Sequence, residues 1–438
     1  MELQLDRKKR LLYLEVYQYY KQLILDRKLL PGSRMPSLRK CSDELHLSRT
    51  TVENAYLQLA ADGYIISRAQ SGYYVTDIAG HRSMPVPDKK ETTPPLLYDL
   101  ASSGVDRESF RFDLWRRYIK SALRQDDRLL SYGEPQGEAD LRQVLADYVR
   151  EHRNVLCSAQ DIVIGAGIQS LLHILVPLLE GRHSVSFPTR SFVQGSTIFS
   201  DYGFDVQYRD KNCDVIYVSP AHMTKWGAIM PVSRRLELVR HALAQGSLII
   251  EDDFENEFVY LQKPTPSLFG LSSGENVVYL GTFSRLLLPS IRLSFMVLPP
   301  SLSEIYRKKA ARYNQTASKA EQIALCQFIR DGHLASQTRR LKRLYAQKLK
   351  TLAACVREIF GDNADVQTGP AGTSLALTLR TEASVEHLMQ AAAKKGLGIQ
   401  ALQDKPGEII LLLSCSSVPV QDIRPACEIL RDVAMGIK

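Results

Sequence analysis

The chain has 438 residues, of which 45% are hydrophobic and 24% charged, a composition typical of a folded globular protein. It holds no apolar run of about 18 residues, and the charged stretch 1–6 does not resemble a signal peptide, so we expect no membrane span. Seven cysteines, never spaced as CxxC, predict neither a disulfide framework nor a standard zinc site. These features are typical of a cytoplasmic protein that is too long for one small domain.

Residues 31–75 carry the signals of two short helices followed by a hairpin. Ser37 and Ser48 are suitable N-caps, and residues 64–68 can pair with residues 73–75 across a turn. The packed face of the second helix would hold Val52, Ala55, Tyr56 and Leu59. Its free face would begin with Arg49, Thr50, Thr51 and Asn54. This order predicts a winged helix whose second helix enters the DNA major groove.

The charge of this region favours the same interpretation. Residues 1–76 hold 12 Lys and Arg against 8 Asp and Glu, a balance of +4 out of +8 for the chain. Any three-helix cap could show the same periodicity, but a generic solvated face would scatter its basic groups. Here they lie in or beside the expected reading helix and wing: Arg34, Arg39, Lys40, Arg49 and Arg68.

The region is similar to the GntR family of bacterial winged-helix regulators. The family's signature pieces stand here as PG at 31–32, MPSLR at 35–39, SRTTV at 48–52 and SGYYV at 71–75. The resemblance implies that DNA is contacted by Arg34, Ser37, Arg39, Ser48, Arg49, Thr50 and Thr51, with Arg68 and Gly72 of the wing at the adjacent minor groove. Glu53 departs from the family, because many relatives have Arg there.

A polar, proline-rich stretch follows, and we expect residues 77–96 to form an extended linker. Residues 97–438 would then form a second domain, with a small subdomain from about residue 335. Strand-like runs at 162–164, 185–187, 215–218, 248–250 and 277–280 alternate with helical stretches. The pattern predicts an α/β fold with a mostly parallel sheet, covered on both faces, and a ligand at the carboxyl ends of the strands.

Three of these strand ends carry suggestive residues. Gly165 and Gly167 precede a helix and could hold a phosphate at its N-terminus, but a third glycine is missing, so this signal is weak alone. Residues 251–253 are three consecutive carboxylates. Residues 281–285 read GTFSR, and Arg292 follows.

Together these segments resemble fold-type I aminotransferases, and their fusion to a GntR-type head resembles the MocR subfamily of regulators. The resemblance implies a homodimer that holds pyridoxal 5'-phosphate. The phosphate would be bound by Gly167, Ile168, Gln169, Thr282 and Arg292, with Tyr132 reaching it from the partner subunit. Asp252 would pair with the pyridine nitrogen, the alternative being a solvated strand end.

Three positions depart from the family of working enzymes. Arg285 stands where relatives have the lysine that bonds the cofactor, and a guanidinium does not lose its proton to become a nucleophile. Phe254 replaces the usual Tyr, and residues 408–413 lack the Arg that holds a substrate carboxylate. We therefore expect no catalytic residue and no metal. We also expect Arg285 to add positive charge to the pocket. Lys225 is the one candidate to replace the missing amine, although a surface lysine is its default interpretation.

We thus expect a dimeric transcriptional regulator that binds double-stranded DNA and senses a small anionic effector. Pyridoxal 5'-phosphate would be bound non-covalently or not at all. Two alternatives stay open: an aminotransferase with an attached DNA-binding head, and an architectural DNA-binding protein with an empty pocket.

Overall fold

The computed structural model describes residues 12–77, 96–101, 104–260, 265–381, 384–405 and 407–436. The chain divides near residue 93 into two compact units, which are described separately. The expected linker at 77–96 lies almost wholly outside the described residues. Among the described helices, none combines the length and the apolar character needed to span a membrane.

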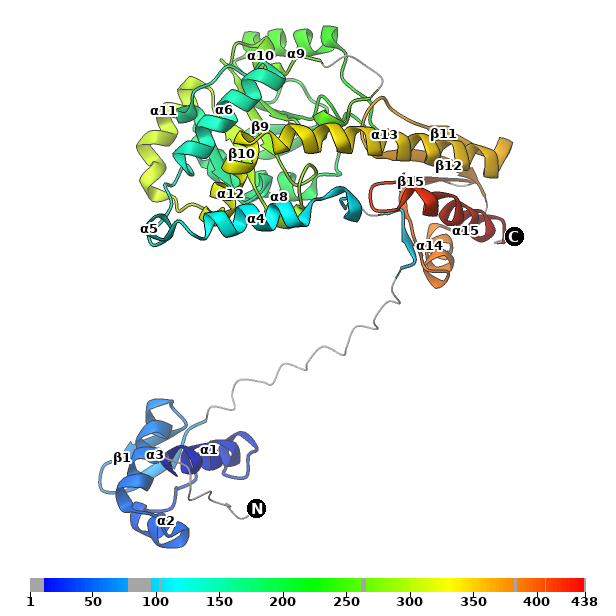
Figure 1. Cartoon of the computed structure of the whole chain (residues 1–438). Coiled ribbons are helices and arrows are strands. Elements are labelled where there is room, and N and C mark those ends of the chain that lie inside the picture. The colour runs from blue at the N-terminus through cyan, green and yellow to red at the C-terminus, as the bar shows by residue number, and fades with distance from the viewer. Residues whose placement is uncertain are drawn as a thin grey trace. The chain divides into compact units, whose positions relative to one another are not determined.

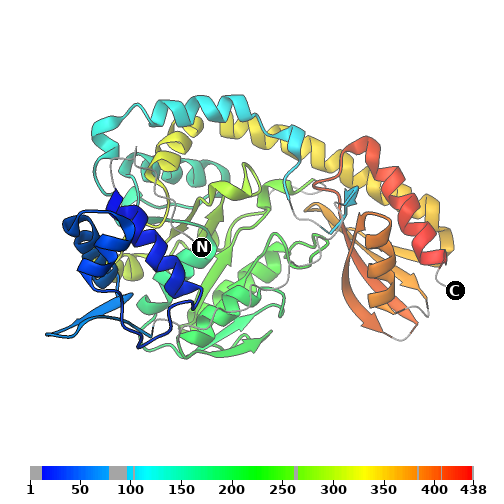
Figure 2. The ribbon, with the colours of Figure 1, turned by 90° about the horizontal axis from the view of Figure 1, so that it is seen from below.

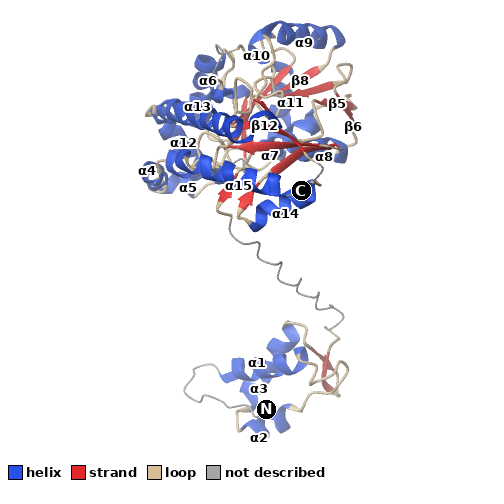
Figure 3. Cartoon of the chain, turned by 90° about the vertical axis from the view of Figure 1, so that its right-hand side faces the viewer, coloured by secondary structure: helices blue, strands red, loops and turns tan. Residues whose placement is uncertain are grey.

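The N-terminal unit has the predicted helix-turn-helix and hairpin, together with a preceding helix that we did not predict (Figures 1 and 3). Ser37 and Ser48 cap α2 and α3, as expected from the sequence. The elements are α1 (Leu12–Leu25), α2 (Leu38–Leu45), α3 (Arg49–Ala61), β1 (Ile65–Arg68) and β2 (Gly72–Val75). Strands β1 and β2 are antiparallel, so the winged-helix prediction is confirmed.

One apolar cluster holds this unit together. Val52, Ala55, Tyr56 and Leu59 of α3 are fully buried against α1, as their spacing predicted. Tyr56 also makes edge-to-face contacts with Tyr20 and Tyr73, which connect α3 to α1 and to the hairpin. The buried stripe leaves the opposite side of α3 free for a ligand.

The C-terminal unit is built on a seven-stranded sheet with the order β4-β10-β9-β8-β7-β5-β6. Only β10 runs against the other strands, so the mostly parallel sheet is confirmed. The strands are β4 (Ile162–Gly165), β5 (Ser184–Phe187), β6 (Asp205–Tyr208), β7 (Val215–Val218), β8 (Leu248–Asp252), β9 (Val277–Thr282) and β10 (Ser294–Val297). β6 and β10 were not among the predicted strands.

Both faces of this sheet are covered, because its strands alternate between two apolar clusters. Ile249 packs on one side, for example, while Leu248 and Ile250 pack on the other. The first cluster includes residues of α4 (Phe112–Ala122), α6 (Ala139–Arg153), α9 (Val232–Gln245), α10 (Leu268–Leu271) and α12 (Lys319–Arg330). The second includes residues of α7 (Ile168–Leu175), α8 (Val193–Asp201) and α11 (Pro300–Lys309). The short helix α5 (Asp126–Leu129) follows α4.

The long helix α13 (His333–Phe360) runs from the large sheet to a second, four-stranded antiparallel sheet (Figure 2). That sheet has the order β11-β12-β15-β14 and shares a core with the end of α13. The elements here are β11 (Ala364–Gln367), β12 (Ser374–Arg380), α14 (Val385–Lys394), β13 (Leu397–Gly398), β14 (Gln400–Lys405), β15 (Glu408–Ser414) and α15 (Ile423–Gly436). β3 (Tyr98–Asp99) pairs with β13 in a separate two-stranded parallel sheet, and the following residue, Leu100, packs into the same core as the small sheet.

Candidate functional site

The expected DNA-binding residues lie on the outside of the N-terminal unit. Arg34, Arg39, Arg49 and Thr50 are exposed, and so is Arg68 of the wing. The Arg68 guanidinium lies 4.5 Å from the centre of the Tyr74 ring, which orients it on the hairpin. Gly72 has a φ of +100° and lies against the Arg34 side chain, so the wing turn and Arg34 are packed together.

The serines of this surface have a structural task. The hydroxyl of Ser37 accepts a hydrogen bond from the N–H of Lys40, and that of Ser48 accepts one from Thr51. The Ser48 and Thr51 hydroxyls are also 2.7 Å apart. The Ser37 contact caps α2, and the Ser48 contacts cap α3, where Arg49 and Thr50 are exposed. A DNA phosphate is the natural ligand of such a helix N-terminus.

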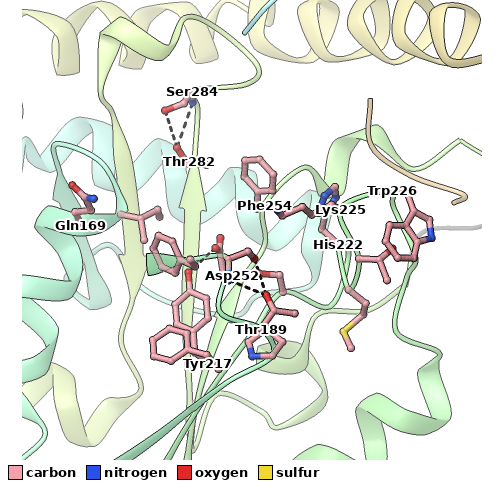
Figure 4. Close-up of a pocket in the computed structure, with 18 of the residues that line it drawn as sticks. Gln169, Thr189, Tyr217, His222, Lys225, Trp226, Asp252, Phe254, Thr282 and Ser284 are labelled. Atoms are coloured by element: carbon pink, nitrogen blue, oxygen red, sulfur yellow. Dashed lines mark hydrogen bonds between the residues drawn. The ribbon is translucent and has the colours of Figure 1, made fainter. Parts of the chain in front are cut away.

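A cavity of about 940 Å³ lies in the C-terminal unit at the carboxyl ends of the parallel strands. Residues that follow β4, β5, β6, β7, β8 and β9 all reach it, as the fold predicts for a ligand site. In Figure 4, Asp252 lies in the middle of the cavity, with Gln169 on one side and Trp226 on the other. The expected residues that line it are Gly167, Ile168, Gln169, Asp252, Thr282 and Arg292.

One end of the cavity is suited to a phosphate. Gly167, with φ +92°, is the N-cap residue of α7, and the first N–H groups of a helix have no partner within the helix. A β-carbon at Gly167 would lie 2.3 Å from an Nη atom of Arg292, so the close approach of this guanidinium requires glycine. Thr282 accepts a hydrogen bond from Ser294 and completes the polar wall. The phosphate end therefore has backbone N–H groups, a hydroxyl and one cation.

The three carboxylates at the end of β8 have separate environments. Glu251 is buried and accepts hydrogen bonds from the backbone N–H groups at the start of α10. Asp253 is buried in a bidentate pair with Arg153. Asp252 alone faces the cavity and accepts a 2.6 Å hydrogen bond from Tyr217. Asp252 is half-buried, and desolvation raises its pKa to about 6.

Arg285 does not have the position that we expected. It is not among the described residues that line the cavity, and its side chain is 7% exposed. The guanidinium donates to Glu255 at 2.7 Å, to the carbonyl of Gly104 at 2.8 Å and to the hydroxyl of Thr373 at 2.9 Å. The expectation that Arg285 adds free charge to the pocket is thus corrected, because Glu255 pairs with that charge outside the cavity.

Lys225 does line the cavity, contrary to its default interpretation as a surface lysine. Figure 4 shows it near Phe254 and His222, opposite the phosphate end. The Phe254 ring packs edge-on against His222, with 5.5 Å between ring centres. Burial lowers the pKa of His222, whose Nδ1 is 3.5 Å from Glu255. This side of the cavity therefore combines aromatic rings with one amine.

The wall formed by the small sheet is apolar. Leu402 and Ile410 line it, in the region where the sequence lacks the expected basic residue. Tyr132 lies elsewhere and is fully exposed. Its loop is held by the ammonium group of Lys319, which donates to the carbonyl oxygens of Arg128, Ser131 and Tyr132.

Several lining residues were missed from the sequence. Tyr217, which bonds Asp252, lies in a predicted strand, and a tyrosine within an otherwise apolar buried strand was the available signal. Phe187 stacks on Tyr217 at 5.0 Å, and Phe192 packs on both rings. Arg209 follows the unpredicted strand β6 and had no recognisable signal.

Comparison with known proteins agrees with both halves of this description. Residues 12–75 match the gntR family of bacterial regulatory proteins, and residues 106–412 match the class I and II aminotransferases. The HTH-type transcriptional regulator YdeL of Bacillus subtilis is 32% identical, over 96% of each chain. The probable rhizopine catabolism regulatory protein MocR of Rhizobium meliloti is 25% identical, over 97% of this chain and 94% of that one.

A third relative is the pyridoxine biosynthesis regulator PdxR of Corynebacterium glutamicum, 28% identical over 85% of this chain and 84% of that one. Among solved structures, an archaeal alanine:glyoxylate aminotransferase has a TM-score of 0.69 at 18% identity, covering 78% of this chain and 91% of that one. At this identity the likeness shows the fold alone.

Fold and sites together define a DNA-binding regulator in which a winged helix is joined to a domain of the fold-type I aminotransferase class. The chain belongs to the MocR subfamily of GntR-type transcriptional regulators.

Proposed function

We propose that this regulator is a homodimer whose aminotransferase-like domain binds a pyridine phosphate without a covalent bond and without catalysis, and thereby controls DNA binding by the winged helix. The observation that carries the proposal is that the residues expected to recognise the cofactor line the cavity, whereas the residue at the position of the reactive lysine does not. The phosphate end and Asp252 line one cavity, whereas Arg285 is bound outside it by Glu255, Gly104 and Thr373. A site that can bind the cofactor but lacks the amine that reacts with it is suited to sensing that ligand.

The cavity fits the phosphate and the ring of such a cofactor. Because Gly167 has no side chain, the Arg292 guanidinium can lie close to the N-terminus of α7, where both can bind an anion. Asp252, positioned by Tyr217, would accept a hydrogen bond from the protonated ring nitrogen, and Phe192 offers an aromatic wall. In enzymes of this fold the bound cofactor supplies an electron sink for reactions at amino-acid carbons. Here the Arg285 guanidinium can neither bond it nor move a proton.

The relatives support the proposed class of ligand and a location in the cytoplasm. PdxR is named as a regulator of pyridoxine biosynthesis, and we propose a ligand of the same chemical class, a pyridine compound, for this chain. The class I and II aminotransferase family, matched over residues 106–412, uses the same class of cofactor. A regulator that binds DNA through its winged helix would work in the bacterial cytoplasm. The purely architectural alternative predicts no ligand in the cavity.

Binding of pyridoxamine 5'-phosphate tests the proposal, because this compound has no aldehyde and cannot form a covalent bond with a lysine. We expect reversible binding to the full chain in equilibrium dialysis. Gly167→Ala should weaken it by about 10- to 150-fold, since charge-assisted hydrogen bonds contribute about 1.5–3 kcal/mol each. Gly203→Ala is the matched control, because Gly203 has a similar φ of +83° but open space around its Cα.

The same measurement should depend on pH in one direction. With a pKa of about 6, Asp252 is ionised at neutral pH and becomes protonated as the pH falls through 6. A neutral Asp252 attracts a protonated ring nitrogen less strongly, so affinity should fall below pH 6. Asp252→Asn should bind weakly at all pH values and lose this dependence. No binding by the unaltered chain would leave the architectural alternative.

We also predict a dimer. Tyr132 is fully exposed on a loop fixed by Lys319, which is what a side chain that reaches a partner's cavity requires. Sedimentation equilibrium at micromolar concentration should give about twice the 49.3 kDa of one chain. Tyr132→Ala should weaken binding of the pyridine phosphate while leaving the head's DNA affinity per half-site unchanged. A monomer under these conditions contradicts the prediction.

A further inference from the structure

A second basic surface lies on the C-terminal unit, where the site above does not use it. Helix α4 buries Trp115, Tyr118 and Ala122 on one side. The opposite side exposes the basic residues Arg116, Arg117 and Lys120, and Arg124 is exposed in the turn just after the helix. Asp113, the one acidic residue of this helix, pairs with Arg116. The stripe formed by these basic residues therefore keeps most of its positive charge.

Helix α13 carries a matching stripe in its first half. Residues 333–346 include four basic residues and no acidic one. Leu334, Leu341 and Tyr345 are buried on one side of the helix. Arg339, Arg340 and Arg343 are exposed on the other side. Figure 2 shows α4 and α13 along the same edge of the domain.

A small cavity of about 120 Å³ lies between the start of α4 and the start of α13, beside Arg340 of the second stripe. Arg111 and Arg340 both line it, together with His333. Partial burial and the nearby charge of Arg111 lower the pKa of Arg340, so the two guanidinium groups repel each other there. Like charges brought together beside a cavity of this size favour an anion such as a phosphate group between them.

We infer that this basic face, made of the exposed basic side chains of α4 and of residues 333–346 with Arg111, binds the phosphate backbone of duplex DNA held by the winged helix. Arginine stripes without base-reading groups suit sequence-independent contacts to phosphates. The 18 residues between Asp77 and Leu96 can span at most about 65 Å, so DNA on the head stays at high effective concentration near the basic face. The inference rests on DNA binding by the winged helix.

Reversal of four charges tests the inference: Arg117→Glu, Lys120→Glu, Arg340→Glu and Arg343→Glu. Affinity is measured for a short duplex that carries only sequences selected by the head, and for the same duplex extended at both ends. The unaltered full chain should bind the long duplex at least about tenfold more tightly, and the variant should lose this gain. Its slope of log K against log salt on the long duplex should fall by about 0.9 for each phosphate that the variant no longer neutralises.

Four reversals on other helices are the control: Arg234→Glu, Arg240→Glu, Lys394→Glu and Lys395→Glu. Equal weakening by both variants would mean a general effect of net charge and would overturn the inference. Binding of the unaltered chain that does not depend on duplex length would overturn it too, while leaving the head's DNA binding intact. If the glutamate variant does not fold, the four glutamine substitutions, which only remove charge, should show the same loss in smaller measure, and their failure to do so counts against the basic face.

Discussion

Replacing Arg285 with lysine should allow borohydride to attach a pyridoxyl group to a chain that otherwise takes none. A lysine amine can lose its proton and attack an aldehyde, whereas the guanidinium cannot. The phosphate end and Asp252 already line the cavity, and Ser284, the residue before position 285, lines it as well. The measurement is mass spectrometry after incubation with pyridoxal 5'-phosphate and reduction, and the expected change is from no label to a label at position 285.

Arg285→Gln is the matched control, because it also breaks the contacts with Glu255, Gly104 and Thr373 but adds no amine. It should take no label. Lys225 is the amine in the unaltered cavity to watch. A reducible label on Lys225 of the unaltered chain would show that the covalent step has moved and would end the proposal of a non-covalent sensor.

Arg49→Ala should weaken binding of a specific duplex by about 5- to 150-fold, which corresponds to about 1–3 kcal/mol. Arg49 is exposed at the first position of α3, where a base edge or phosphate lies within reach once the helix is in the major groove. Fluorescence anisotropy with a labelled duplex at several salt concentrations measures both the affinity and the number of phosphates contacted.

Lys28→Ala removes the same charge from the turn after α1 and should change the affinity by less than about twofold. If Arg49→Ala behaves like this control, α3 is not the reading helix. Both variants should keep the unfolding temperature of the parent unit, because neither side chain is buried in the apolar cluster around Tyr56.

The sequence by itself was sufficient for several features whose information is local, although α1 and β10 were missed. Helix caps such as Ser37 and Ser48 act on N–H groups three residues away, and the period of Val52, Tyr56 and Leu59 is set by one helix. Apolar runs likewise marked β4, β5, β7, β8 and β9, because strands buried on both faces must be apolar throughout. β6 has a half-exposed edge pattern and therefore escaped notice.

Only the tertiary structure decided which residue has which role at the cavity. Three adjacent carboxylates look alike in sequence, yet Asp253 meets Arg153 from 100 residues away while Asp252 meets Tyr217. For the same reason Arg285, expected in the cavity, lies outside it, and Lys225, expected at the surface, lines it. Glu255, Gly104 and Thr373 come from three distant segments and together hold the guanidinium outside the cavity, which leaves Lys225 as the amine within it. Contacts of this kind form only when distant segments pack together, so the local pattern of the sequence does not predict them.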